Sequence, residues 1–303
     1  MRIVSLIASA TEIVCALGLR GSLVGRSHEC DSPADVADLP ALTAAQFDLS
    51  LASAGIDAAV KSLVRDGLAV YRVDQERLRA LAPDVILTQD QCEVCAASLK
   101  DVEAAVCDWV GRPVQIVSLR PNCLADIWSD ITRVGAALGV EGAARNLVRD
   151  LKARISAARQ QAPPVKIACI EWIDPVMTAG HWIPELIDAV GGTSLLAEGG
   201  GPSPYVSLED IAAADPDVIV VAPCGFDVER SVADMPALAA RDVWKDLRAV
   251  REGRVAIADG NKFFNRPSPS VAQTAEILAD IRAHLERGEP ARWGAHVWQV
   301  WRG

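Results

Sequence analysis

The sequence predicts an α/β protein with two Rossmann-like lobes, a long rigid helix that joins them, and a ligand cleft between the lobes. Residues 78–92 and 211–224 follow one pattern: a short helix, a Pro-Asp turn, a buried apolar strand and a loop that holds a cysteine. Residues 141–160 have a helical pattern with no strand beside them. Because ligands bind beyond the carboxyl ends of the strands in open α/β sheets, the repeated pattern predicts two binding edges.

The N-terminal lobe is predicted to span residues 1–122. Ser9 is expected to cap a helix, with Glu12 at the capping-box position and Gly18 at its end. The expected strands are residues 3–6, 23–25, 85–87 and 114–117. Strands that alternate with helices indicate a parallel sheet.

A helical linker is predicted over residues 123–163, with helices at 124–138 and 141–160. At about 1.5 Å per residue the second helix would extend roughly 30 Å, which is long enough for a stiff connection between two lobes. Pro163 and Pro164 are expected to end it.

The C-terminal lobe is predicted to span residues 164–303 and to repeat the alternation of strands and helices. The expected strands are residues 166–170, 217–221 and 254–258, and the expected helices are residues 184–189 and 270–285. The tail contains Trp293, Trp298 and Trp301. These side chains are expected either to cover an apolar groove of the same chain or to mark an oligomer contact.

Composition and charge exclude two classes of partner. The 303 residues carry a net charge of -10, and no basic stripe is visible, so a nucleic-acid partner is not expected. No apolar run reaches the roughly 20 residues that cross a bilayer, so no membrane span is expected. Residues 2–7 resemble a first core strand rather than a charged leader, which predicts a cytoplasmic protein, or a periplasmic one if the true start lies upstream.

Four of the eight cysteines are expected to be structural. These are Cys15, Cys107, Cys123 and Cys169, which lie in helical or strand patterns or at a helix start. In a reducing compartment they would be free thiols, and a free cysteine often behaves as a small buried hydrophobic residue.

The other four cysteines, Cys30, Cys92, Cys95 and Cys224, lie in loops beside polar residues. Cys92 and Cys95 form a CxxC motif, which can be half of a metal site, a redox pair or a coincidence. One hypothesis is that the four thiolates bind a transition metal or an iron–sulfur cluster, with or without catalysis. Another hypothesis is a redox enzyme that uses Cys92 and Cys95 as a dithiol.

Candidate ligand contacts cluster after the strands of the second lobe. An aromatic ring beside an acid or an imidazole combines apolar contact area with a polar group, which suits a large flat ligand. The residues predicted to contribute contact area are Trp172, Trp182, Tyr205 and Phe264. Those predicted to make polar contacts are Glu171, His181 and Asn265, with Arg266 at the rim.

Common catalytic and cofactor motifs do not occur. The sequence has no nucleophile elbow, phosphate loop or dinucleotide fingerprint, and residues 199–201 form a glycine run without a helix start behind it. His28 and Cys30 are only two residues apart, so a catalytic Cys–His pair is not expected. A binding protein is therefore the leading interpretation, with an enzyme as the alternative.

Short motifs run in a specific order along nearly the whole chain. They are Ser9-Ala10-Thr11-Glu12, Leu17-Gly18, Asp31-Ser32-Pro33, Ala82-Pro83-Asp84-Val85-Ile86, Thr178-Ala179-Gly180, Gly191-Gly192, Val206-Ser207-Leu208-Glu209 and Asn265-Arg266-Pro267-Ser268-Pro269. In these motifs the chain resembles the ABC-importer substrate-binding proteins that carry cobalamin and, more distantly, those for ferric siderophores and haem.

The resemblance implies two α/β lobes joined by a rigid helix, with a shallow cleft that binds one large ligand and closes little. It implies a soluble binding protein for cobalamin, a related corrinoid or a similar metal-bearing macrocycle. An ABC permease is the partner expected if the protein is exported.

Overall fold

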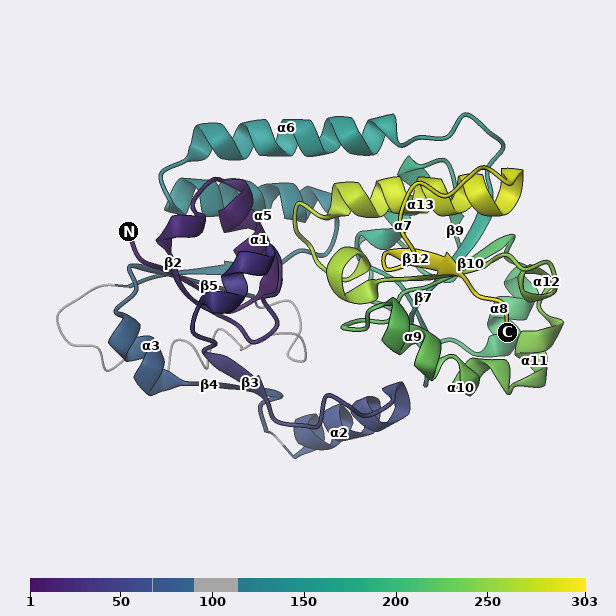
Figure 1. Cartoon of the computed structure of the whole chain (residues 1–303), viewed down its shortest axis with the longest axis horizontal. Helices are drawn as coiled ribbons and strands as arrows, with labels where there is room; N and C mark the ends of the chain where they lie inside the picture. The colour runs from purple at the N-terminus through teal and green to yellow at the C-terminus, as the bar shows by residue number, and fades with distance from the viewer. Residues whose placement is uncertain (67, 90–113) are drawn as a thin grey trace. The chain divides into compact units, whose positions relative to one another are not determined.

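The computed structural model describes residues 1–66, 68–89 and 114–303, which form two compact units (Figure 1). The N-terminal unit consists of Met1–Leu51, Gly55–Pro121 and Ala125–Arg149. The C-terminal unit consists of Ala52–Ala54, Asn122–Leu124 and Asp150–Gly303. The predicted α/β class with two lobes is confirmed, whereas the lobe boundaries at residues 122 and 164 stay a prediction.

The N-terminal unit is built on a parallel sheet with the strand order β2-β1-β5-β6. The strands are β1(Ile3–Ser5), β2(Leu23–Arg26), β5(Val85–Gln89) and β6(Gln115–Leu119). An antiparallel pair, β3(Thr43–Ala45) and β4(Tyr71–Val73), and two 3₁₀ turns, η1(Arg20–Ser22) and η2(Ala34–Asp38), complete its irregular part. All four strands predicted for this lobe are present.

The described helices of the N-terminal unit alternate with its strands. They are α1(Ala8–Ala16), α3(Gln75–Leu81) and most of α2(Ser53–Arg65) and α5(Leu124–Ala137). Helix α6(Glu141–Ala157) begins in this unit, and its last residues belong to the C-terminal unit. It ends three residues before the predicted boundary at residue 160.

The predicted capping box of the first helix is wrong. Helix α1 begins at Ala8 with Ile7 as its N-cap, and no side chain caps it. Ser9 and Glu12 lie inside the helix and are buried. The chain turns directly from β1 into the helix, and the hydroxyl of Ser5 donates to the carbonyl of Ile7 in that turn at 3.0 Å.

The C-terminal unit is built on a six-stranded sheet with the order β12-β11-β10-β7-β8, in which β9 also pairs with β7. Its strands are β7(Lys166–Trp172), β8(Met177–Thr178), β9(Thr193–Ser194), β10(Val218–Val221), β11(Val255–Ala258) and β12(Trp298–Val300). The central strands β7, β10 and β11 are parallel, as predicted. Strand β10 is buried along its whole length because helices cover both faces of the sheet.

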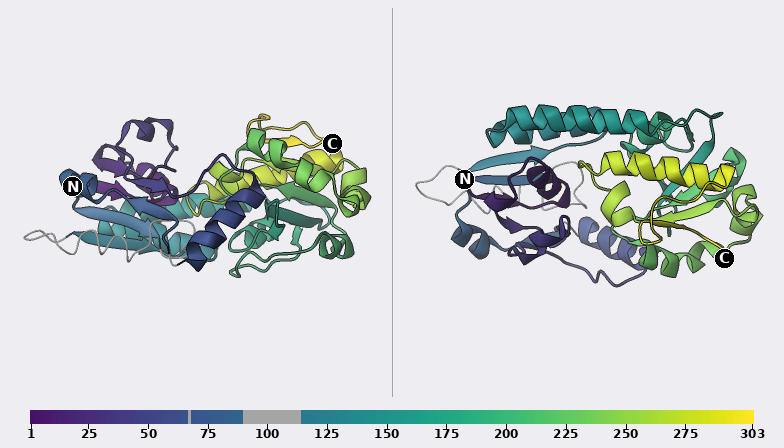
Figure 2. Two further views of the ribbon diagram at one scale, coloured as in Figure 1. Left: turned by 90° about the horizontal axis from the view of Figure 1, so that it is seen from below. Right: turned by 45° about the horizontal axis from the view of Figure 1, so that its top comes forward.

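Helices lie on both faces of this sheet (Figure 2). They are α7(Ile183–Ala189), α8(Leu208–Ala214), α9(Val228–Asp234), α10(Pro236–Ala239), α11(Asp242–Asp246), α12(Arg248–Arg251) and α13(Val271–Arg287), with the π-helical turn η3(Gly260–Phe264) before α13. Ile219 and Val221 share a core cluster with residues of α8 to α12. Val218 and Val220 therefore point to the opposite face, where α7 and α13 pack against each other.

The repeated Pro-Asp turn has the same structure in both units. Helices α3 and α8 both end at a left-handed residue, Ala82 with φ 43° and Asp215 with φ 47°. In the N-terminal unit the carboxylate of Asp84 accepts the backbone N–H of Arg2 at 2.7 Å, and the N–H of Asp84 donates to the carbonyl of Arg2 at 2.8 Å. We call this two-bond contact the Asp clasp.

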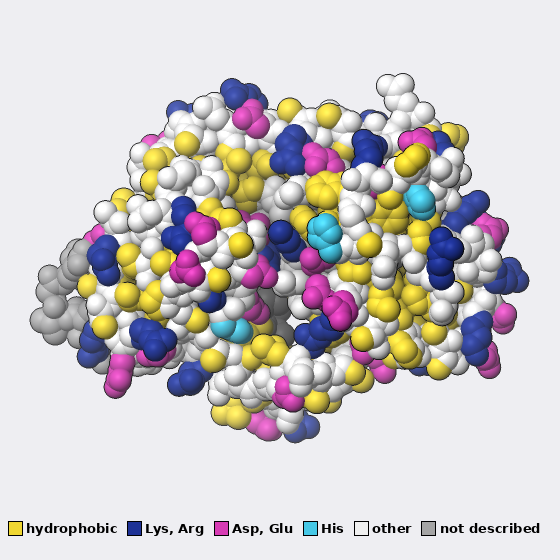
Figure 3. All heavy atoms as spheres, in the orientation of Figure 1, with side chains coloured by type: hydrophobic (Ala, Val, Ile, Leu, Met, Phe, Trp, Pro, Cys, Tyr) yellow, Lys and Arg dark blue, Asp and Glu magenta, His cyan; other side chains and the backbone are white. Residues whose placement is uncertain are grey.

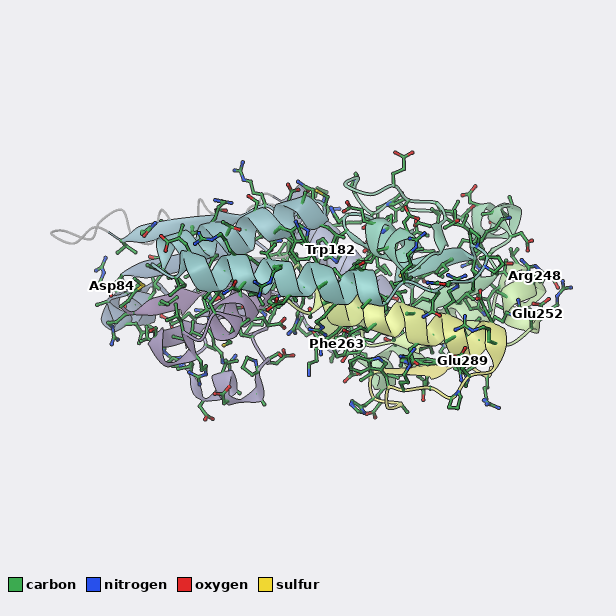
Figure 4. All side chains as sticks on the ribbon, turned by 90° about the horizontal axis from the view of Figure 1, so that it is seen from above. Asp84, Trp182, Arg248, Glu252, Phe263 and Glu289 are labelled. Carbon is green, nitrogen blue, oxygen red and sulfur yellow. The ribbon has the colours of Figure 1, made fainter. Side chains whose placement is uncertain are left out.

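The C-terminal unit forms the same Asp clasp between Asp217 and Lys166. The carboxylate of Asp217 accepts the N–H of Lys166 at 2.9 Å, and the N–H of Asp217 donates to the carbonyl of Lys166 at 2.9 Å. The guanidinium of Arg248, labelled with Glu252 in Figure 4, lies 2.9 Å from a carboxylate oxygen of Asp215 and 2.8 Å from one of Asp217. Burial alone would raise the pKa of Asp217, but the Lys166 N–H and Arg248 lower it below its usual value.

The tryptophans of the tail pack on their own chain. The indole N–H of Trp298 donates to the buried carboxylate of Asp280 at 3.0 Å, and the ring of Trp301 contacts Trp244 edge-on at 5.9 Å. Of the two expectations for the tail, covering the same chain is confirmed for these two residues.

In residues 1–66, 68–89 and 114–303 no helix combines the length and the apolar character that a bilayer crossing needs.

The Asp clasp is expected to stabilise the C-terminal unit. Asp217→Ala leaves the N–H of Lys166 and the guanidinium of Arg248 without this acceptor, which should lower the free energy of unfolding by about 1–2 kcal/mol. Urea denaturation followed by circular dichroism measures the loss. Asp246→Ala, which truncates an exposed carboxylate on α11, should change it by less than about 0.5 kcal/mol, and equal effects of the two substitutions would contradict the prediction.

Candidate functional site

The candidate site of the C-terminal unit lies at the carboxyl ends of β7, β10 and β11. The backbone N–H of Cys224, in the loop after β10, donates to the carbonyl of Glu171 at 3.0 Å. The side-chain amide of Asn265 donates to the carbonyls of Ala222 and Gly260, each at 3.0 Å. Asn265 therefore ties together the segments that follow β10 and β11, and we call this region the C-terminal edge.

Close backbone packing at the C-terminal edge requires a glycine. A Cβ atom built on Gly260 would lie 2.1 Å from the carbonyl oxygen of Pro223, which no real side chain tolerates. The loops after β10 and β11 thus approach each other directly, and this approach positions the start of η3.

Trp172 lies at the end of β7 against the aromatic side chain of Phe226, with ring centroids 5.4 Å apart. The guanidinium of Arg230, on helix α9, lies 3.8 Å from the Phe226 centroid. The indole nitrogen of Trp172 is buried and has no hydrogen-bond acceptor among the described residues. An unsatisfied donor of this kind is uncommon in folded proteins and marks a group that a ligand can satisfy.

His181 occupies a constrained position before helix α7. Its φ is 53°, in the left-handed region, and its backbone bonds to residues of the 200–201 turn, donating to Gly201 at 2.7 Å and accepting from Gly200 at 2.8 Å. Its ring stacks on Trp182 with centroids 5.8 Å apart. Burial lowers the pKa of His181, so the imidazole is neutral near pH 7.

Three of the predicted contact residues are packed inside the unit. Trp182 is 6 % exposed and donates its indole N–H to the carbonyl of Phe264 at 3.2 Å. Phe264 is only 1 % exposed, and Arg266 is also buried, donating to the side chain of Asn261 at 3.1 Å. These three side chains therefore pack inside the unit beneath the C-terminal edge and are not exposed to a ligand.

Tyr205 is the exposed aromatic residue of the group. Its side chain is 55 % exposed, and its backbone forms an isolated bridge with Met177 of β8, which in turn pairs with Trp172. All eight predicted contact residues thus belong to the C-terminal unit. The surface that they offer is concentrated on Glu171, Trp172, His181 and Tyr205, with Asn265 between the strand ends.

The N-terminal unit carries a second polar edge, at the carboxyl ends of β1 and β2. The hydroxyl of Thr11 donates to Ser5 at 2.8 Å and lies 3.0 Å from the sulfur of Cys30. Cys30 is 1 % exposed, so its thiol belongs to this internal network. We call the region around the loop after β2 the N-terminal edge.

His28 stands at the centre of the N-terminal edge. The hydroxyl of Thr43 donates to Ser27 at 3.0 Å, and Nδ1 of His28 lies 2.7 Å from the same hydroxyl, so Nδ1 is the donor of that pair. The opposite nitrogen, Nε2, then carries a lone pair, and it is buried with no partner in the described part of the chain. Burial, with a contribution from Arg26, lowers the pKa of His28 and keeps the ring neutral.

Tyr71 and Glu29 complete this edge. The Tyr71 hydroxyl donates to the Glu29 carboxylate at 3.0 Å, and the Tyr71 ring lies 5.3 Å from that of His28. Sequence reasoning missed Tyr71, Glu29 and Thr43. The position of residues 27–33 directly after a predicted strand was the available signal, because loops at strand ends carry binding residues.

The predicted thiolate site has no support in the described residues. Cys30 is buried in the N-terminal unit and Cys224 is exposed in the C-terminal unit, while Cys92 and Cys95 lie outside the described residues. Within residues 1–66, 68–89 and 114–303, no group of three or more His, Cys, Asp and Glu side chains is placed to hold a metal ion. Nothing here favours the iron–sulfur or dithiol-enzyme hypotheses.

The thiols expected to be structural behave as such where they are described. Burial raises the pKa of Cys15 to about 11, and it also raises the pKa of Cys169, which is in the middle of β7. Both thiols therefore stay protonated and unreactive near pH 7. Cys123 is half-buried, and Cys107 lies outside the described residues.

Two α/β units, each with polar and aromatic side chains at the carboxyl edge of a parallel sheet, are the architecture of a substrate-binding protein. The chain belongs to the family described as periplasmic binding protein, whose match covers residues 3–261. The predicted resemblance to substrate-binding proteins of ABC importers is thereby confirmed.

Curated relatives match nearly the whole chain at low identity. The vitamin B12-binding protein of Vibrio parahaemolyticus is 22 % identical over 291 residues, covering 94 % of this chain and 89 % of that protein. An uncharacterised ABC transporter substrate-binding lipoprotein of Bacillus subtilis is 24 % identical over 291 residues, covering 92 % of this chain and 79 % of that protein.

Solved structures share the fold. The periplasmic vitamin B12-binding protein of Vibrio cholerae superposes with a TM-score of 0.62 at 21 % identity, covering 94 % of this chain and 98 % of that one. The periplasmic heme-binding protein of a Roseiflexus species gives a TM-score of 0.66 at 23 % identity, with the same coverage of both chains.

The predicted cytoplasmic location is wrong. The matching family is one of periplasmic binding proteins, the Bacillus subtilis relative is a lipoprotein, and the solved structures with this fold include periplasmic proteins. The thiolate-cluster hypothesis assumed a reducing cytosol, and these findings contradict that location.

Acid should destabilise the protein partly through His181. Its pKa is lowered by folding, so the contribution of the neutral ring is fully present above about pH 6.5 and is lost as the pH falls below that value. His181→Asn keeps a residue that tolerates the left-handed backbone and removes the titration. Urea denaturation at pH 7.5 and at pH 5.5 should show a smaller loss of stability on acidification in the variant than in the wild type.

The control for this experiment is His296→Asn, which removes an exposed imidazole from the tail. It should lose as much stability on acidification as the wild type. A wild-type pH dependence in His181→Asn would show that His181 is not the responsible group.

Proposed function

We propose that this chain is the extracytoplasmic substrate-binding component of an ABC importer and that it binds cobalamin or a closely related corrinoid. The observation that carries the proposal is the match of 94 % of the chain to a vitamin B12-binding protein, within a family match over residues 3–261. The partners would be the corrinoid and an ABC permease.

The chemistry of the two edges supports a large, amide-rich ligand. The buried indole N–H of Trp172 is a donor without an acceptor, and Nε2 of His28 is an acceptor without a donor. The amide groups around a corrin ring present both carbonyl acceptors and N–H donors, so an amide of this kind can satisfy either group. Buried groups that are left unsatisfied cost about 1–3 kcal/mol each, and a ligand that satisfies them recovers this free energy.

Aromatic and acidic side chains add to the C-terminal edge. The half-exposed ring of Tyr205 can pack on a flat macrocycle, and the Glu171 carboxylate can accept N–H groups of its amides. Tyr205 bridges to Met177, the neighbour of Trp172 in the sheet, so the two aromatic side chains belong to one strand-end region.

The direct test is isothermal titration of the purified protein with cyanocobalamin and, separately, with hemin. We expect cyanocobalamin to bind with a Kd below about 10 μM, near -7 kcal/mol, and at least about tenfold more tightly than hemin. Binding of hemin without binding of cyanocobalamin at about 100 μM would refute the corrinoid proposal and leave the family assignment intact.

Tyr205 offers a separate test of the C-terminal edge. Tyr205→Ala removes an exposed ring and should weaken cyanocobalamin binding about five- to tenfold, which corresponds to about 1–1.4 kcal/mol of lost aromatic contact. Leu68→Ala is the matched control, because Leu68 is equally exposed at 56 % and lies in the other unit. It should leave the affinity unchanged, and the same loss in both variants would count against a role for Tyr205.

A further inference from the structure

A groove of about 800 Å³ lies at the β12 edge of the C-terminal sheet. Its lining includes Val300 of β12 and Trp301 directly after it, Val250 and Arg251 of α12, and Leu285 of α13. The groove therefore lies beside the edge strand of the sheet, between residues of α12 and α13. We call it the β12 groove.

The β12 groove is distinct from the candidate ligand site. It is lined by Val250 and Gly253, which precede β11, whereas the C-terminal edge involves Gly260, which follows β11. The groove therefore lies toward the amino end of β11, and the ligand-contact residues lie at the carboxyl end.

Strand β12 presents free backbone groups to this groove. It pairs with β11 on one side only. The N–H of Asp259 donates to Val297 and the N–H of Trp301 donates to Val255, so residues 297, 299 and 301 face β11. In an antiparallel pair the alternate residues point away, and the N–H and carbonyl of Val300 therefore face outward. Neither group has a hydrogen-bond partner in the described part of the chain.

The side chains of the groove are cationic and aromatic. Lys245, Arg251 and Arg302 line it together with the aromatic rings of Trp301 and His284, and no Asp or Glu does. Arg251 and Arg302 form no ion pair with the residues that the structure describes, whereas Lys245 pairs with Asp242 at 2.9 Å. In a chain with a net charge of -10, this is a local concentration of positive charge. Figure 3 shows dark blue and magenta side chains beside yellow ones on the C-terminal unit.

We propose that the β12 groove binds an extended acidic peptide segment of another protein, which adds as a strand to the free edge of β12. The backbone of the segment would bond to Val300, its acidic side chains would pair with Arg251 and Arg302, and an apolar side chain would pack on Trp301. A second copy of this chain is disfavoured as the occupant, because pairing two β12 edges would bring two cationic grooves together.

The test uses a fluorescein-labelled octapeptide of alternating Glu and Val, and a Lys and Val octapeptide as its counterpart. Fluorescence anisotropy with the full chain should show binding of the acidic peptide that weakens with added salt, and no binding of the basic one.

The double variant Arg251→Glu/Arg302→Glu should bind the acidic peptide at least about tenfold more weakly and should gain binding of the basic peptide. Arg145→Glu, an exposed reversal on α6, should keep wild-type affinity within about twofold.

A backbone variant separates strand addition from simple charge attraction. Val300→Pro removes the outward N–H at an edge position that tolerates proline, and it should weaken the acidic peptide about fivefold while all charges remain. Circular dichroism checks that the variants are folded. Equal binding of both peptides, wild-type affinity in the double variant, or a dimer in light scattering that Val300→Pro dissolves would each overturn the proposal.

Discussion

The Asp clasp is the contact on which the binding edges depend. Asp84 holds the backbone of Arg2 at the amino end of β1, and Asp217 holds that of Lys166 at the amino end of β7. Each clasp aligns two neighbouring parallel strands, which fixes the pairing of Ile3 with Val85 in one sheet. A slip of one residue would turn every side chain of a strand to the opposite face. The clasp at one end of the strands therefore determines which side chains stand at the other end.

Two buried charges on α13 connect the rest of the C-terminal unit to this sheet. The Arg282 side chain is fully buried and donates to the carbonyls of Val190 at 3.1 Å, Gly191 at 2.8 Å and Pro163. Asp280, two residues earlier, accepts the backbone N–H of Arg292 and the indole of Trp298. A buried charge that loses its hydrogen-bond partners is strongly destabilising, so these contacts tie α13 to both the segment before β7 and the tail.

The strands were predictable because their signals are local. An apolar run after a Pro-Asp turn describes both β5 and β10, and the clasp explains why that dipeptide recurs. The Ser9 cap failed because the chain enters α1 already at Ala8, so that Ser9 lies inside the helix rather than before it. Local sequence patterns thus predict that a helix or strand is present, but not the residue at which it begins.

The candidate site was predictable only in part, because its orientation is a tertiary property. Aromatic residues beside glycine-rich loops have the same sequence pattern whether they face inward, as Trp182 and Phe264 do, or outward, as Tyr205 does. The contact between Tyr71 and His28 requires the β3–β4 pair, which joins residues far apart in the sequence and has no strong turn signal. The contacts within the N-terminal edge therefore depend on the tertiary fold.

The charge state of the edges bears on the choice between cobalamin and haem as the ligand. Of three cations at the described part of the C-terminal edge, Arg230 lies over Phe226, Arg266 is buried against Asn261, and only Lys262 is exposed. The two propionates of haem would need such cations, since an unpaired carboxylate is costly to desolvate. A corrin with uncharged amides instead needs neutral donors and acceptors, and the neutral imidazole of His28 and the indole of Trp172 are groups of that kind.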